Sequence, residues 1–153
     1  MLLENSLYKK TIQLTDSDNQ TNIVIPFRIE ELYQYLEIDV SYTPQEVSER
    51  IAKEKILSAL PKYHVNLENW NDFLPLLNLI TVSVSHNDSY IGCRHTKESV
   101  QKIIISEDAS SLGFINYGIV QGSWELQLNL HCICSDVEVQ LQVKGVKNEV
   151  LFK

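Results

Sequence analysis

Two closely spaced pairs of metal-type ligands stand out in the sequence, Cys93-x-His95 and Cys132-x-Cys134. Residues i and i+2 of a strand point to the same face, so each pair could offer two ligands from one side of a sheet. If the two strands were neighbours, these four side chains would suit a tetrahedral zinc site. Cys132 and Cys134 also continue a leucine stripe, and a buried cysteine behaves as a small hydrophobe. We therefore predict three reduced core thiols and no metal or other cofactor, with zinc and redox chemistry as alternatives.

Other catalytic patterns are weak. Ser99-x-x-Lys102 matches an acylation motif, but the companion Lys-Thr-Gly is missing. No phosphate-binding or dinucleotide fingerprint is present, and the chain has only five glycines. The four histidines share no spacing, and we expect surface or turn positions for His64, His86, His95 and His131. Whether the protein is an enzyme stays open, and the sequence favours a protein that is not.

Composition narrows the class of protein. A chain of 153 residues with 44% apolar residues can build one core, so we expect a single globular domain over residues 1–153. The net charge of −7 argues against nucleic acid and anionic membranes as partners, and it permits a partner protein with a basic surface. No apolar run is long enough to span a membrane, and the N-terminus does not resemble a signal peptide. With its odd number of cysteines, the chain is expected to be cytoplasmic.

The clearest structural pattern lies between Trp124 and Val146. Apolar and polar residues alternate on both sides of Ser135-Asp136, as in two strands that each have one buried face. A turn at Ser135-Asp136 would pair Leu128 with Val143 and place all the apolar residues on one face. We therefore predict a long antiparallel hairpin as the scaffold of the fold.

The remaining elements complete an α+β fold. Alternation predicts an N-terminal hairpin from residues 7–14 and 23–29, and a hairpin over residues 80–93 that turns at Asn87-Asp88. Helical spacing or capping residues predict helices at 28–37, at 44–60, after Asn66 and after Thr96, followed by a surface loop over 106–118. The expected fold is an antiparallel sheet of three hairpins with a helical middle segment packed on one face.

One short segment resembles a known inhibitor. Residues 59–70, with Pro61, Tyr63, Asn66 and Trp70, look like the helix-to-helix turn of the barstar family of nuclease inhibitors. The segment lacks that family's glycine after the aromatic pair, and Glu68 stands where the family has aspartate. A shared way of capping a helix accounts for the resemblance equally well, so we do not assign the chain to the family.

Three functions follow as hypotheses. The first is a non-catalytic protein-binding domain, of the inhibitor, immunity or accessory type, that occupies a partner's surface. The second is a small enzyme or ligand-binding domain whose histidines, tyrosines and carboxylates converge only in the fold. The third is a structural subunit or homodimer joined through open strand edges. The candidate partner-binding residues are Phe114, Tyr117, Glu125, Gln127, His131 and Gln140.

Overall fold

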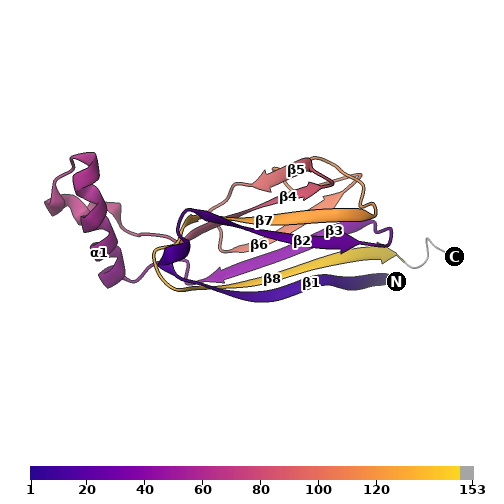
Figure 1. Cartoon of the computed structure of the whole chain (residues 1–153), viewed down its shortest axis with the longest axis horizontal. Coiled ribbons are helices and arrows are strands. Elements are labelled where there is room, and N and C mark those ends of the chain that lie inside the picture. The colour runs from indigo at the N-terminus through magenta and orange to yellow at the C-terminus, as the bar shows by residue number, and fades with distance from the viewer. Residues whose placement is uncertain (149–153) are drawn as a thin grey trace.

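The protein is a β-sandwich with a helical segment at one end (Figure 1). The computed structural model describes residues 1–148. The strands are β1 (Leu2–Leu14), β2 (Thr21–Ile29), β3 (Tyr35–Thr43), β4 (Leu79–His86), β5 (Ser89–Arg94), β6 (Val100–Ser106), β7 (Gly122–Cys132) and β8 (Val137–Asn148). The helices are α1 (Glu49–Ala59) and the short 3₁₀ helices η1 (Asp16–Asp18), η2 (Leu60–Tyr63) and η3 (Leu67–Phe73).

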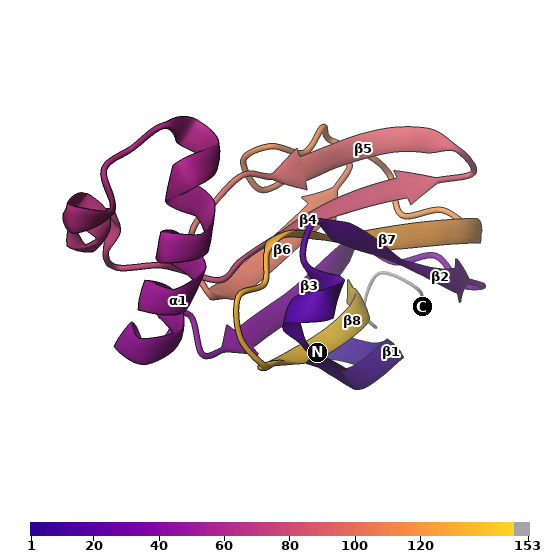
Figure 2. The same cartoon turned by 60° about the vertical axis from the view of Figure 1, so that its left-hand side comes forward.

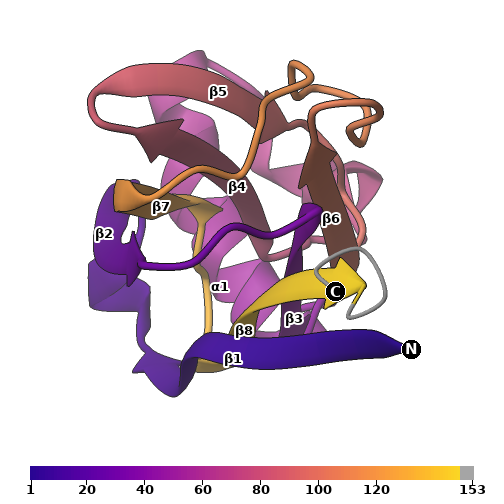
Figure 3. The same ribbon diagram turned by 90° about the vertical axis from the view of Figure 1, so that its right-hand side faces the viewer.

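Two four-stranded antiparallel sheets form the sandwich. Sheet A has the order β1-β8-β3-β6, and sheet B has the order β2-β7-β4-β5. Viewed end-on, the sheets lie one above the other, with β5 and β6 on the same side (Figure 3). Because side chains alternate along a strand, each sheet turns one apolar face inward, and the two faces meet in one continuous core.

The predicted α+β class with antiparallel strands is confirmed, but the single sheet of three hairpins is wrong. Within residues 1–148, β4 and β5 are the only consecutive strands that pair with each other. Their turn lies at Asn87 and Asp88, as predicted, and both residues have positive φ angles. Each of the other connections between these strands leads to the opposite sheet.

The predicted hairpin between Trp124 and Val146 is the main correction. Both strands exist and both bury the predicted faces, but β7 pairs with β2 and β4, whereas β8 pairs with β1 and β3. Residues 133–136 carry the chain from sheet B to sheet A, so Leu128 and Val143 belong to opposite walls of the core. Alternation fixes which face of a strand is buried and leaves its hydrogen-bonding partner open.

The N-terminal hairpin fails for the same reason, and two predicted helices are strands. Strands β1 and β2 lie in different sheets, joined through η1. The helix predicted at 28–37 is replaced by the end of β2 and the start of β3. The helix predicted after Thr96 is the edge strand β6, where Gln101 takes an inward position and donates hydrogen bonds to Ile80 O and Glu98 O at 3.1 and 3.0 Å.

The helical segment, residues 44–78, extends from one end of the sandwich instead of covering a face (Figure 2). Helix α1 begins at Glu49, later than predicted, because the chain before it bridges back to Leu77 through Glu46. The predicted cap at Asn66 is confirmed, since its side chain accepts a hydrogen bond from Glu68 N. This segment has a small core of its own, formed by Val47, Ala52, Ile56 and Leu60 with Trp70 and Leu74 packed against it.

Candidate functional site

The six residues predicted to bind a partner do not form one surface. Glu125, Gln127 and His131 share the outer face of sheet B, because they alternate with the buried residues of β7. Gln140 lies on the outer face of sheet A, at the other side of the sandwich. Phe114 and Tyr117 lie in the connection between β6 and β7, and their rings pack against the core. This connection, residues 107–121, is called the closing loop below.

The closing loop is tied to the edge of sheet A. Ser111 N donates to Ile104 O at 2.8 Å, and Ile104 N donates to the Ser111 hydroxyl at 2.8 Å. Ser106 N donates to the Ser110 hydroxyl, while Tyr117 N donates to Ser106 O at 2.8 Å. Backbone N–H and C=O groups on the open edge of β6, which could otherwise pair with another strand, are therefore hydrogen-bonded within the chain.

The same loop is tied to the edge of sheet B. Cys93 N donates to Gly113 O at 3.2 Å, and Ile115 N donates to Ile91 O at 3.0 Å. Gly92 and Phe114 form a backbone bridge between these two hydrogen bonds. The loop thus spans the gap between β5 and β6 and closes one side of the sandwich, where Figure 3 shows it in orange.

Two glycines allow this close approach. Gly92 and Gly113 have φ angles of +154° and +98°. A Cβ on Gly92 would lie 2.2 Å from Gly113 O, and a Cβ on Gly113 would lie 2.2 Å from Cys93 O. Because both obstacles are backbone atoms, no side-chain rotation can relieve either clash. Glycine is therefore needed at both positions for the closing loop to lie this close to β5.

Aromatic residues anchor the end of the loop that leads into β7. The Tyr117 hydroxyl lies 2.6 Å from His86 Nδ1, and His86 Nε2 lies 3.2 Å from Gln121 O. A carbonyl only accepts, so Nε2 carries the proton and Nδ1 accepts from Tyr117. Trp124 packs on both rings and donates from Nε1 to Val120 O at 2.9 Å. His86 is therefore a buried structural residue, not a surface one.

While its aromatic residues turn inward, the loop turns aliphatic side chains outward. Leu112 is 93% exposed and Ile115 is 56% exposed, although the backbone on both sides of them is hydrogen-bonded. Glu107 and Asp108, at the start of the loop, are also exposed. An ordered loop that holds large apolar groups in water is typical of a protein-binding surface. Sequence reasoning singled out the loop but chose its anchors, Phe114 and Tyr117, as the contact residues.

The outer face of sheet A carries an acid–base cluster. Lys144 Nζ lies 2.8 Å from Glu37 and 3.4 Å from Asp39, and Lys102 Nζ lies 3.7 Å from Glu37. The hydrogen bond from Lys144 holds the pKa of Glu37 below its usual value, while burial and the neighbouring Glu37 carboxyl raise the pKa of Asp39. A shallow groove of about 270 Å³ crosses all four strands beside it, with Gln140 in its lining. The charges pair within the protein, which favours a structural role.

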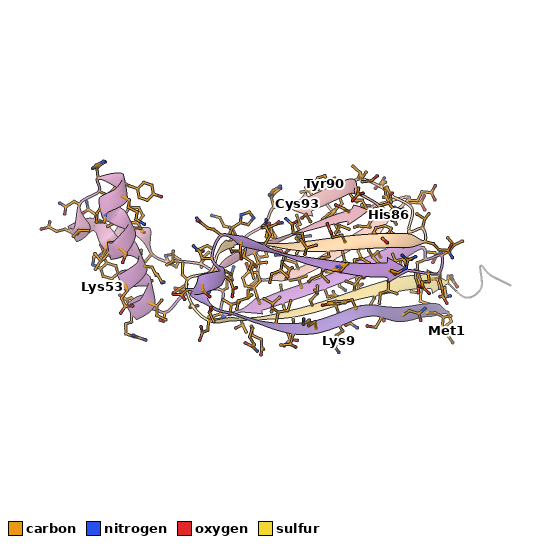
Figure 4. The ribbon with its side chains drawn as sticks, in the orientation of Figure 1. Met1, Lys9, Lys53, His86, Tyr90 and Cys93 are labelled. Atoms are coloured by element: carbon orange, nitrogen blue, oxygen red, sulfur yellow. The ribbon has the colours of Figure 1, made fainter. Side chains whose placement is uncertain are left out.

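The outer face of sheet B carries a polar network. Thr81 Oγ1 lies 2.7 Å from His131 Nε2, and Asn129 Nδ2 donates to Thr81 Oγ1 at 3.2 Å. Gln127 Nε2 donates to Asn129 Oδ1 at 2.7 Å, and Cys93 Sγ lies 3.9 Å from Thr81 Oγ1. His131 and Gln127 are therefore engaged with their neighbours. Figure 4 places Cys93 on this side of the sandwich and Lys9, on β1, at the other.

The four histidines do not converge on one site with a carboxylate, as the enzyme hypothesis expected. His95 and His131 line a groove of about 380 Å³ on sheet B. His64 is the C-cap residue of η2 in the helical segment. Within residues 1–148, no histidine forms a hydrogen bond or ion pair with a carboxylate. A catalytic histidine is normally oriented by such a partner. The geometry therefore gives the enzyme hypothesis no specific support.

The cysteines are placed differently from the prediction. The register between β4 and β7 shifts at His131, so that Leu79 pairs with Cys132 and Ile80 with Leu130. This bulge reverses the alternation, and Ile133 takes the core position that was expected for a cysteine. Cys132 and Cys134 are half-buried at the crossing between the sheets, and Cys93 is buried on the outer side of β5.

The four proposed zinc ligands are not brought together. Cys132 and Cys134 adjoin each other, whereas Cys93 belongs to the polar network on sheet B. Among the residues that the structure describes, no three His, Cys, Asp or Glu side chains are grouped so that they could hold a metal ion.

Comparisons with known proteins add no family. No family model, curated protein or solved structure matches the chain. In the described part of the chain, no helix is both long and apolar enough to cross a membrane.

Proposed function

We propose that this chain is a non-catalytic protein-binding domain of the inhibitor or accessory type, which inserts the aliphatic side chains of the closing loop into an apolar pocket of its partner. The observation that supports this most is the combination of a fixed backbone and exposed side chains at Leu112 and Ile115. A preorganised loop loses little conformational entropy when it binds, so the apolar area it buries contributes more to affinity.

The negative charge of this chain suggests that the rim of the partner's pocket is basic. Glu107 and Asp108 are exposed in the same loop as the aliphatic residues, and the chain carries a net charge of −7. Basic groups around an apolar pocket would complement this surface and raise the rate of association. The proposed partner is therefore a protein with a basic rim, and the proposed setting is the cytoplasm, where three thiols without a disulfide are typical.

Self-association through strand edges has less support. The closing loop covers the edges of β5 and β6, which leaves β1 and β2 as the outer strands of the two sheets. Pro26 interrupts the donor row of β2, and β1 carries Lys9 and Lys10. Proline and lysine on edge strands discourage edge-to-edge pairing.

The test is affinity capture from native extract with three forms of the chain. The wild type should retain one partner in stoichiometric amount. Leu112→Asp should lose it, because a charge would enter the apolar pocket. Val24→Asp should retain it, since Val24 is half-exposed on β2, away from the loop. Equal retention by Leu112→Asp and Val24→Asp would show that the closing loop is not the contact surface.

A further inference from the structure

Two thiols converge where the chain crosses from sheet B to sheet A. Cys132 Sγ and Cys134 Sγ lie 3.1 Å apart, at hydrogen-bonding distance. Regular strand geometry separates residues i and i+2 too far for such contact. Here β7 ends at Cys132, and Ile133 turns into the core, so the flanking side chains swing together. The spacing is therefore a product of the crossing and not of a continuous strand.

Two asparagines hold this arrangement in place. Ile133 N donates to Asn19 Oδ1 at 2.8 Å, and Cys134 N donates to Asn78 Oδ1 at 2.8 Å. Asn78 is fully buried, and its amide also donates to Pro44 O at 3.0 Å. The backbone between the two cysteines is thus fixed, which keeps the two sulfur atoms together.

The pair opens onto a charged groove beside the helical segment. The groove has a volume of about 470 Å³, and its lining includes Cys134 and the charged residues Asp16, Glu54, Lys55 and Asp136. The hydrogen bond from Cys132, with the nearby Lys55 ammonium, lowers the pKa of Cys134 to about 7. The same hydrogen bond raises the pKa of Cys132. One thiol is thus the better nucleophile near neutral pH, and the other remains protonated beside it.

We propose that Cys132 and Cys134 form a redox-active dithiol that exchanges with small aliphatic disulfides. The Cys134 thiolate attacks one sulfur of the substrate disulfide, which breaks the S–S bond and releases one thiolate. Cys132 then gives up its proton to solvent and attacks Sγ of the mixed disulfide, which releases the second thiolate. The two cysteines are oxidised to one disulfide, and the substrate is reduced to two thiols.

Selectivity among the three cysteines comes from their exposure and surroundings. Lys55 lies in the groove beside Cys134, paired with Asp16 at 2.7 Å, and its ammonium favours the thiolate form of Cys134. Cys93, by contrast, is only 8% exposed and lies among the side chains of the polar network. It should react slowly, so the exchange is confined to the pair at the crossing.

The experiment uses the full, reduced chain and oxidised glutathione near neutral pH. Intact-mass analysis should show the loss of two hydrogen atoms, and peptide mapping should locate the disulfide between Cys132 and Cys134. Cys132→Ser should accumulate a mixed disulfide on Cys134, because the resolving thiol is absent. Cys134→Ser should react at least about tenfold more slowly. Circular dichroism checks that each variant is folded.

Lys55 supplies a matched pair of variants. Lys55→Gln should slow the exchange at neutral pH by about twofold or more, because it removes the cation beside Cys134. Lys53→Gln should leave the rate unchanged, since Lys53 lies on the same helix but over the Trp70 ring. Three intact thiols after prolonged exposure, or glutathione attached to Cys93 alone, would overturn the proposal. Neither result bears on binding by the closing loop.

Discussion

Replacing Gly113 with alanine should detach the closing loop from β5. The added Cβ would lie 2.2 Å from Cys93 O, and the residue would have to keep a φ of +98°. Holding alanine in that conformation costs about 1–3 kcal/mol before any clash is counted. Releasing the loop instead loses the hydrogen bonds at Cys93 N and Ile115 N, each contributing about 0.5–1.5 kcal/mol. We therefore expect Gly113→Ala to lower the free energy of unfolding by about 2–4 kcal/mol.

Gly118 offers the matched control within the same loop. A Cβ there would lie 3.9 Å from Val120 Cγ1, which is an ordinary contact. Gly118→Ala should therefore leave stability within about 1 kcal/mol of the wild type, or raise it slightly. The measurements are urea denaturation followed by circular dichroism, and hydrogen exchange at the amides of Cys93 and Ile115. If both variants unfolded at the same urea concentration with both amides still protected, the loop would not be fixed by this approach.

Two other predictions concern the core and the acid–base cluster. Leu128→Ala should cost about 2–5 kcal/mol in urea denaturation, because Leu128 is fully buried, whereas the outward-facing Gln142→Ala should cost less than about 0.5 kcal/mol; equal costs would mean that the strand faces are assigned wrongly. The lowered pKa of Glu37 means that its charge stabilises the fold above pH 4.5 and that this stability is lost as the pH falls through the folded pKa. The raised pKa of Asp39 has the opposite effect on stability, because the charged form of Asp39 is disfavoured in the fold and stability is lost as the pH rises through its folded pKa. At about pH 7, Glu37→Gln should therefore destabilise the protein, and Asp39→Asn should not. A thermal-melting series from about pH 3 to pH 7 checks this, and a loss with Asp39→Asn as large as that with Glu37→Gln would contradict it.

How far the sequence predicts this fold depends on what alternation can encode. The buried faces of β8 and of β7 as far as Leu130 were predicted correctly, because apolar side chains must leave water whichever strand lies beside them. The strands that pair with β7 and β8 were not predicted, because the same two buried faces are compatible with a hairpin and with two opposed sheets. The choice is made by residues 133–136, where Asn19 and Asn78 hold the crossing from distant parts of the chain.

Strands β3 and β6 were not predicted, because local sequence patterns in both segments favoured helices. Leu36, Ile38, Val40 and Tyr42 alternate as a strand, but the spacing of Leu32, Tyr33 and Leu36 favoured a helix. In β6 a polar residue, Gln101, occupies a core position and breaks the apolar alternation. Its Nε2 donates to Ile80 O on the opposite sheet, a partner that no local pattern reveals.

The sequence predicted the surface loop, but it did not show which side chains of the loop face outward. The segment rich in serine, glycine and asparagine indicated a surface loop, and that is confirmed. Phe114 and Tyr117 were candidates as members of this loop, and in the fold both rings pack against the core. The signal for Leu112 and Ile115 was their apolar character within a polar segment, and only the fold shows that they point outward.

The central claim is that the closing loop meets the partner, and hydrogen exchange of the complex tests it most directly. Once the captured partner is identified, exchange is compared for the free and bound chain. The proposal predicts that protection gained on binding is concentrated in residues 107–116, around Leu112 and Ile115. Protection gained only on β1, β2 or the outer faces of the sheets, with no change in the closing loop, would contradict it.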